Sequence, residues 1–136
     1  MARFIGRYEH SLDVKGRVIL PVKFRAPFER GGFLSQYHDG CLALWTPEEY
    51  DRQLETMEQE SVQGRDQRNL ARVWAQGSTE VEVDRSGRMA IPAYLRNWAQ
   101  LESEVLIMGA IGRVEIWSPP VWEERVLPSE RQLADA

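Results

Sequence analysis

The sequence predicts an α+β fold, rich in β-structure, made of two copies of a small half-barrel related by a pseudo-twofold axis and flanked by helices. Two alignments within the chain predict the duplication. Residues 12–25 align with residues 83–96, and residues 40–47 align with residues 112–119 in the same order and at nearly the same offset. Size is the third observation. A half of about 45–50 residues buries too little apolar surface alone, so the halves are expected to fold against each other.

In the first aligned block the two halves agree in the turn, at the proline after the second strand and at the final arginine. Identical residues occupy five of the fourteen aligned positions, and most of the other apolar positions stay apolar. The identical pairs are Asp13/Asp84, Gly16/Gly87, Arg17/Arg88, Pro21/Pro92 and Arg25/Arg96. The second block aligns a strand that ends in Trp45 with one that ends in Trp117, and both side chains are expected in the core. Two matched blocks in one order indicate an internal repeat.

Each half is expected to start with a β-hairpin. Residues 79–84 alternate polar and apolar side chains, as a half-buried strand does, and residues 8–12 do so less regularly. A turn that contains glycine follows in each half. A short apolar strand comes next, at residues 18–20 in the first half and 89–91 in the second.

Helices are expected after the hairpins and after the tryptophan strands. Proline suits the first position of a helix, and residues 92–100 carry an apolar helical face, whereas Pro27 must shorten or distort the matching helix of the first half. Residues 46–49 supply an N-cap threonine, a proline and a capping-box glutamate. Ser118 opens the equivalent helix in the second half.

These elements divide the chain into four parts. We expect a first repeat at residues 7–54, a helical linker at residues 55–82, a second repeat at residues 83–126 and a polar tail at residues 127–136. The linker has a modest apolar helical stripe, and the tail is expected to fray.

Charge is distributed unevenly along the chain. The net charge is −4, yet residues 1–30 carry a net +4 and residues 31–64 a net −6. A basic block followed by an acidic one can leave a positive face on an acidic protein, and nucleic acid responds to that local face. Scattered solvated charge is the alternative that composition alone leaves open.

Several function classes lack their signatures in this sequence. No apolar run approaches the roughly 20 residues that span a bilayer, and the amino terminus lacks the apolar core of a signal peptide, so we expect a cytoplasmic protein with no membrane partner. Cys41 lies in an apolar run and is expected to be buried. His10 and His38 lack metal-ligand spacing, and no phosphate loop or nucleophile motif occurs. We therefore expect no enzyme, no metal, no cofactor and no small-molecule substrate.

The repeated turns at residues 13–17 and 84–88 are the candidate site. Each turn glycine can adopt the positive φ that such a loop needs. Each aspartate can accept backbone N–H groups across the turn and can also hold the arginine, whose planar guanidinium suits phosphate or the guanine edge. The orienting aspartates are Asp13 and Asp84, the aimed arginines are Arg17 and Arg88, and the turn glycines are Gly16 and Gly87.

Two readings of these turns stay open from the residues alone. Each aspartate and arginine can simply brace its turn, or the arginines can contact nucleic acid. Retention of both residues in two diverged copies favours contact with nucleic acid. Arg25 and Arg96 are also retained and fall within the expected helices. We interpret them as structural or interface residues, and contact with nucleic acid stays open as the less favoured alternative.

With these motifs the sequence resembles the MraZ family, whose members carry two SpoVT-AbrB-type repeats. The resemblance covers roughly residues 4–126. It rests on residues 13–17 with Leu20-Pro21, on residues 84–88 with Ile91-Pro92, and on the elements at residues 45–47 and 117–119.

The resemblance implies a swapped-hairpin-like β-barrel of the AbrB type with added helices, assembled as a homo-oligomeric ring. It also implies binding to repeated G-rich boxes in double-stranded promoter DNA upstream of the division and cell-wall gene cluster, usually as a repressor associated with the nucleoid. Arg17 and Arg88 would contact the DNA, and Lys15 would add a phosphate contact. Ser86 replaces a basic residue in the second turn, where Arg85 can compensate.

A second function class stays open beside DNA binding. The chain could be a non-catalytic assembly or partner-binding protein, and its five tryptophans are consistent with that role. Trp74, Trp98 and Trp122 are the candidates for contacts between protomers.

Overall fold

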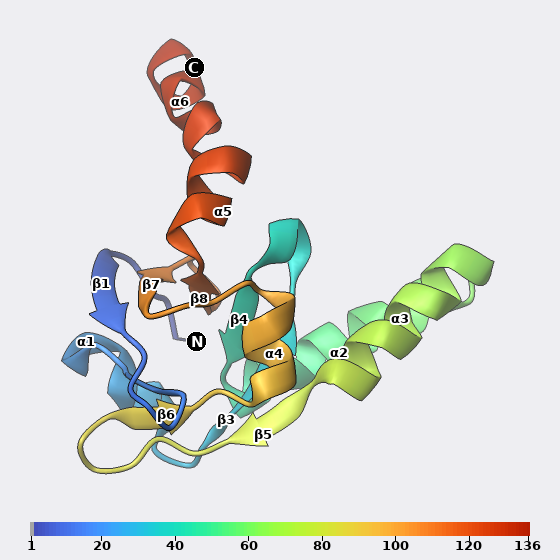
Figure 1. Ribbon diagram of the computed structural model, residues 1–136. Coiled ribbons are helices and arrows are strands. Elements are labelled where there is room, and N and C mark those ends of the chain that lie inside the picture. The colour runs from blue at the N-terminus through green and yellow to red at the C-terminus, as the bar shows by residue number, and fades with distance from the viewer. Residues whose placement is uncertain (1) are drawn as a thin grey trace.

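The computed structural model describes residues 2–136, which form eight strands, six α-helices and three short 3-10 helices (Figure 1). The strands are β1 (Arg7–Ser11), β2 (Arg17–Ile19), β3 (Gly32–Gln36), β4 (Leu42–Trp45), β5 (Thr79–Val81), β6 (Arg88–Ala90), β7 (Glu104–Gly109) and β8 (Val114–Trp117). The helices are α1 (Val22–Arg25), α2 (Pro47–Ser61), α3 (Arg65–Gly77), α4 (Ala93–Trp98), α5 (Pro119–Arg125) and α6 (Glu130–Asp135). The 3-10 helices are η1 (Ala26–Phe28), η2 (His38–Gly40) and η3 (Leu127–Ser129).

The strands form one antiparallel six-stranded sheet and one separate two-stranded ribbon. The order in the sheet is β1-β7-β8-β4-β3-β5, and β2 pairs with β6 in the ribbon. The predicted α+β class is therefore confirmed, although the described chain has more residues in helices than in strands. The six-stranded sheet is open, with β1 and β5 at its two edges.

The two halves exchange strands across the sheet. β1 of the first half pairs with β7 of the second. β5, the counterpart of β1 at the end of the expected linker, pairs with β3 of the first half. The strands that match each other in the repeat pair directly, β2 with β6 and β4 with β8. These pairings relate the halves by a pseudo-twofold axis, as the duplication predicts.

The hairpin expected in each half is limited to its turn. The strands on either side of the first turn go to different partners, β1 to β7 and β2 to β6. The physical reason is ladder length, because β2 has only three residues, whereas β7 offers β1 a register of five residue pairs from Arg7↔Met108 to Ser11↔Glu104. Longer pairing satisfies more backbone groups.

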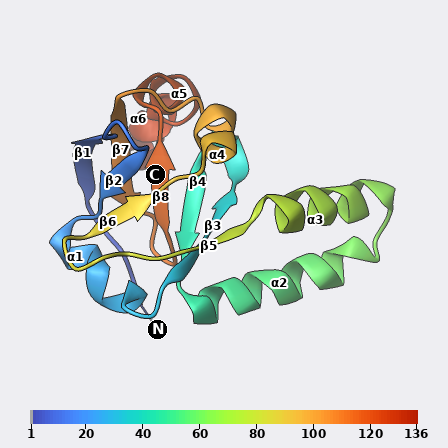
Figure 2. The same cartoon turned by 60° about the horizontal axis from the view of Figure 1, so that its bottom comes forward.

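Helix boundaries follow the local signals. Pro27 ends α1 after four residues and lies in η1, so the predicted distortion is confirmed. The N-cap at Thr46 is also confirmed, since its side chain accepts a hydrogen bond of 3.2 Å from the backbone N–H of Glu49. Helices α2 and α3 form an antiparallel pair that extends away from the sheets, in green in Figure 2.

The carboxyl-terminal end is more regular than the predicted frayed tail. After η3, residues Glu130–Asp135 form helix α6, which leaves the body of the molecule together with α5 (Figure 1). This stretch has neither glycine nor proline and consists largely of residues with good helix propensity. Its side chains are exposed, so the tail is polar and helical at once.

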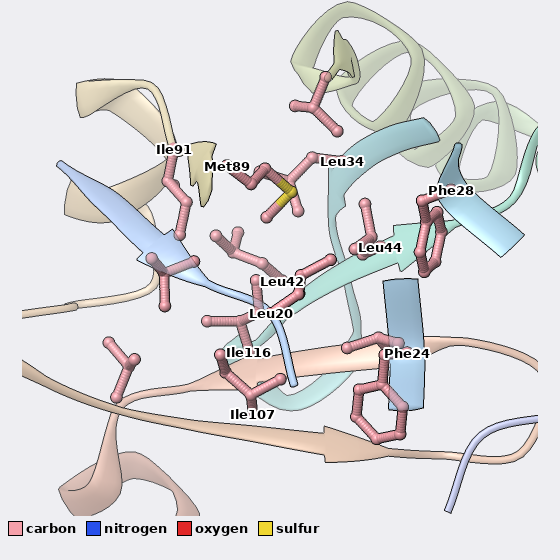
Figure 3. Packing of buried hydrophobic residues seen from close by; sticks show 14 of the residues in the cluster. Leu20, Phe24, Phe28, Leu34, Leu42, Leu44, Met89, Ile91, Ile107 and Ile116 are labelled. Atoms are coloured by element: carbon pink, nitrogen blue, oxygen red, sulfur yellow. The ribbon is translucent and has the colours of Figure 1, made fainter. Parts of the chain in front are cut away.

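The main core lies between the ribbon and the sheet (Figure 3). Leu20 and Ile91, which follow the ribbon strands, meet Ile107 and Ile116 of the sheet there, and each is fully buried. The opposite face of the sheet is covered by helices, so strands β4 and β8 are buried along their whole length. The ribbon is thereby anchored on its inner face and open on its outer one.

The predicted burial of the repeated tryptophans is confirmed. Trp45 and Trp117 are almost fully buried, and so is Cys41, where burial raises the pKa of the thiol far above its ordinary value. The remaining tryptophans differ from one another. Trp74 is buried against Tyr50, whereas Trp98 is exposed.

Candidate nucleic-acid interface

The ribbon presents both candidate arginines on one face. Its register pairs Val18 with Met89, and both side chains are buried against the core. Because side chains alternate along a strand, the residues on either side of Val18 and Met89 point outward. Arg17 and Arg88 therefore lie on the same outward face.

The spacing of these arginines follows from the same register. Arg17 lies opposite Ala90, and Arg88 lies opposite Ile19, so the arginines occupy a diagonal two residues apart. With about 3.4 Å per residue along a strand and about 4.8 Å between strands, their Cα atoms lie about 8 Å apart. The B-DNA major groove, about 12 Å wide, admits a two-stranded ribbon of this kind.

The turn before β2 is closed by its aspartate. Oδ1 of Asp13 accepts hydrogen bonds from the backbone N–H groups of Lys15, at 2.9 Å, and Arg17, at 2.8 Å. Oδ2 accepts from Nε of Arg17 at 2.8 Å. Gly16 has a φ of 75°, the left-handed region that glycine adopts without steric cost.

The turn before β6 repeats this geometry atom by atom. Oδ1 of Asp84 accepts from the backbone N–H groups of Ser86 and Arg88, both at 2.9 Å, and Oδ2 accepts from Nε of Arg88 at 2.7 Å. Gly87 has a φ of 83°. Two copies that differ at the turn tips have kept one hydrogen-bonding unit.

This unit fixes the guanidinium and leaves its outer end available. The aspartate bonds only Nε, and within residues 2–136 the terminal amino groups of Arg17 and Arg88 make no hydrogen bond. The two side chains are 31% and 43% exposed. Each can still donate two parallel hydrogen bonds to a phosphate or to the guanine edge.

The electrostatic state of the aspartates fits this role. The pKa of Asp13 is lowered from its ordinary value, first because the backbone N–H of Arg17 donates to the carboxylate and also because the Arg17 side chain does. Arg88 lowers the pKa of Asp84 in the same way. Both carboxylates therefore stay ionised near neutral pH and keep holding their arginines.

The other predicted basic residues lie at the tips of the turns. Lys15 and Arg85 are exposed there, beyond the closing hydrogen bonds, and Ser86 occupies the position that matches Lys15. Acidic side chains lie near the two ribbon arginines rather than at the turn tips. Glu80 and Glu82 line an open depression together with Arg17, Arg88 and Asp84, so the local field mixes both signs.

Two exposed apolar residues of the candidate interface were not predicted from the sequence. Ile19 lies beside Arg88 on the outward face of the ribbon and is 45% exposed, and Val14 stands fully exposed at the first turn tip. Apolar side chains at such places can contact thymine methyl groups. Residues 18–20 read as a uniformly apolar strand, so only the pairing of β2 with β6 distinguishes Ile19 from its buried neighbours.

Among residues 2–136, no group of three or more His, Cys, Asp or Glu side chains lies together where it could hold a metal ion. In the same part of the chain, no helix is long and apolar enough to cross a membrane.

Comparison with known proteins gives one consistent result. The MraZ family model, described as "MraZ protein, putative antitoxin-like", matches residues 3–73 and 75–133. A protein named "Transcriptional regulator MraZ" from Caldanaerobacter subterraneus subsp. tengcongensis is 40% identical over 120 residues, 88% of this chain and 84% of its own. A protein of the same name from Heliobacterium modesticaldum is 37% identical over 135 residues, 97% of this chain and 94% of its own.

Proposed function

The chain belongs to the MraZ family, and from that premise we propose that it is a DNA-binding transcription regulator whose β2–β6 ribbon reads promoter DNA. One observation carries the proposal. Arg17 and Arg88 share the outward face of the ribbon, and each is held by an ionised aspartate that leaves its terminal amino groups available.

The residue roles follow from the chemistry of each side chain. Arg17 and Arg88 contact guanine edges or phosphates, and Asp13 and Asp84 orient them. Lys15 adds a phosphate contact as a mobile point charge. In the second turn Arg85 supplies the positive charge that Ser86 lacks.

Binding to repeated G-rich boxes by a homo-oligomeric ring explains how the protein binds DNA more tightly than one ribbon can. One ribbon offers two guanidinium groups, its phosphate contacts are sensitive to salt, and Glu80 and Glu82 lie nearby. Several ribbons linked in one ring convert weak single contacts into strong binding through effective concentration. On this proposal the protein acts in the cytoplasm, at the nucleoid, as a repressor of the division and cell-wall gene cluster.

We also propose that the fold is the swapped-hairpin barrel of the AbrB type. The strand exchange between the halves supports it, with the β2–β6 ribbon covering the open six-stranded sheet. The proposed units are repeats at residues 7–54 and 83–126, a helical linker at 55–82 and a tail at 127–136.

An assembly or partner-binding role is the second candidate, and one surface favours it. A groove between α2, α3 and α4 is lined by the apolar residues Leu70, Val73 and Trp98, all exposed. The buried Nε1 of Trp74 has no hydrogen-bond partner within the described chain and belongs to the same groove. Such a patch is typical of a protein contact, which a ring of protomers also requires.

The double substitution Arg17→Ala with Arg88→Ala tests DNA binding. Because a bidentate contact to a base is worth about 1–3 kcal/mol, we expect the Kd for the DNA upstream of the gene to rise by at least about 30-fold. The measurement is a gel shift at fixed salt, with native mass spectrometry for the size of the assembly, which should not change.

The matched control is Arg68→Ala with Arg72→Ala, which removes the same charge from the exposed surface of α3. If the two double variants lose equal affinity, binding depends on net charge rather than on these turns. If neither variant loses affinity while the wild-type protein binds, the ribbon is not the DNA-binding element, and the partner-binding role gains support.

A further inference from the structure

Each candidate turn is held in place by the opposite repeat. The backbone N–H of Ile91 donates to the carbonyl of Gly16 at 3.0 Å, and the N–H of Leu20 donates to the carbonyl of Gly87 at 2.8 Å. Ile91 follows the second turn, and Leu20 follows the first. The turn in one half therefore depends on the strand end of the other.

An arginine completes each of these crossed contacts. The guanidinium of Arg96 lies against Gly16, where a side-chain carbon built on the glycine would overlap it. The guanidinium of Arg25 lies against Gly87 in the same way. Both glycines are buried although they lie in otherwise exposed turns. Glycine is thus required there for its positive φ and also for the approach of the arginine.

The arginines are themselves anchored on the residues that grip the turns. Nε of Arg25 donates to the carbonyl of Leu20 at 2.9 Å, and the Arg96 guanidinium donates to the carbonyl of Ile91. Leu20 therefore uses its N–H to hold Gly87 and its carbonyl to hold the arginine that covers Gly87. Ile91 and Arg96 form the equivalent unit around Gly16.

We infer that Arg25 and Arg96 are positioning residues for DNA binding, and that each acts on the turn of the other repeat. Arg96 sets the direction of Arg17, and Arg25 sets the direction of Arg88. Removing either guanidinium leaves a gap over a glycine, the residue type with the greatest backbone freedom. The turn can then change conformation, so that the arginine beside that glycine loses its fixed direction. This inference rests on the proposed DNA-binding function.

A crossed pattern of coupling in double-mutant cycles tests the inference. We expect Arg96→Ala to raise the Kd for the upstream DNA by about fivefold in the wild-type and Arg88→Ala backgrounds, and by less than about twofold in the Arg17→Ala background. Arg25→Ala should show the reverse pattern. A general loss of stability or charge would raise the Kd equally in every background, and that result would overturn the inference.

Two further measurements separate positioning from folding. Urea unfolding of each variant defines the conditions in which it is fully folded, and Kd values are compared only there. Arg96→Lys keeps a donor for the Ile91 carbonyl, and we expect it to recover part of the lost affinity. If Arg96→Lys recovers no affinity, and Arg96→Ala loses the same affinity in the Arg17→Ala and Arg88→Ala backgrounds, the role of Arg96 is purely structural.

A DNA-free measurement keeps the inference distinct from the function on which it rests. By NMR, Arg96→Ala should speed hydrogen exchange at the amide of Gly16 and at Nε of Arg17, with little change at Gly87 and Arg88. If the wild-type protein binds no DNA but this crossed pattern appears, the proposed function fails and the crossed holding of the turns stands. Equal changes at both turns, or changes only within the same repeat, would contradict the crossed arrangement.

Discussion

At the scale of single residues, the aspartate of each turn performs two tasks with its two oxygens. Oδ1 of Asp13 accepts two backbone N–H groups and closes the turn, and Oδ2 accepts Nε of Arg17 and aims it. Asp84 does the same for Arg88. The two hypotheses left open by the sequence, that the aspartate and arginine brace the turn and that the arginine contacts DNA, are therefore compatible. An arginine held only through Nε still has the hydrogen-bond donors of its terminal amino groups.

The lowered pKa of these aspartates predicts a pH dependence. We expect the Asp13→Asn, Asp84→Asn variant to be less stable than the wild type by a constant amount between pH 8 and pH 5. Because the carboxylates are held ionised in the folded state, their stabilisation is present above the ordinary pKa of about 3.9 and is lost as the pH falls through the lowered value. The difference in the free energy of unfolding should thus shrink below about pH 4.

Urea unfolding at a series of pH values measures this difference. Asp51→Asn with Asp66→Asn removes the same charge from α2 and α3 and gives the background effect of net charge. A difference that grows as the solution becomes acidic would refute the assigned role of the carboxylates.

At the scale of elements, the local signals determine helix ends more reliably than strand partners. The threonine, proline and glutamate at residues 46–49 start α2 where expected, because capping is decided within four residues. The strand β1 pairs instead with β7, nearly one hundred residues away. Alternation indicates that a strand exists, but it carries no information about which strand lies beside it.

The cap of α2 gives a prediction at this scale. We expect Thr46→Ala to lower the free energy of unfolding by about 1 kcal/mol, because the backbone N–H of Glu49 loses its acceptor at the helix start. Chemical denaturation measures the effect. Ser118→Ala is the matched control, since Ser118 precedes α5 without a side-chain capping bond. Equal losses in the two variants would mean that the Thr46 hydrogen bond contributes nothing specific.

At the scale of the whole molecule, the two halves form one interleaved unit. β1 and β5 each complete the other half, the ribbon takes one strand from each, and the turns are gripped across the same axis. The main core draws on both halves (Figure 3). Because neither half has all of its strand partners, neither can bury its apolar surface alone.

Dividing the chain between Gly77 and Ser78 tests this dependence. We expect the fragments 1–77 and 78–136 to lack a cooperative thermal transition when they are separate, and to regain one when mixed in equal amounts. Circular dichroism detects the transition, with the intact chain as the reference. A cooperative transition in either fragment alone would show that a half folds independently.

The sequence by itself determined the duplication, the α+β class, the burial of Trp45 and Trp117, and the turns that carry Arg17 and Arg88. These features are encoded by short local sequence patterns and by composition, and the same patterns can be recognised in both halves. The resemblance to the MraZ family, carried by the same turns, is confirmed by the family match.

Only the tertiary structure decided which strands pair and that Arg25 and Arg96 reach across to the opposite turn, whereas the duplication already predicted that both arginines lie on one side of the molecule. Ile19 became visible as an exposed neighbour of Arg88 for the same reason. Such features depend on contacts between segments about 70 residues apart. A local sequence pattern does not specify the direction from which a distant segment packs against it.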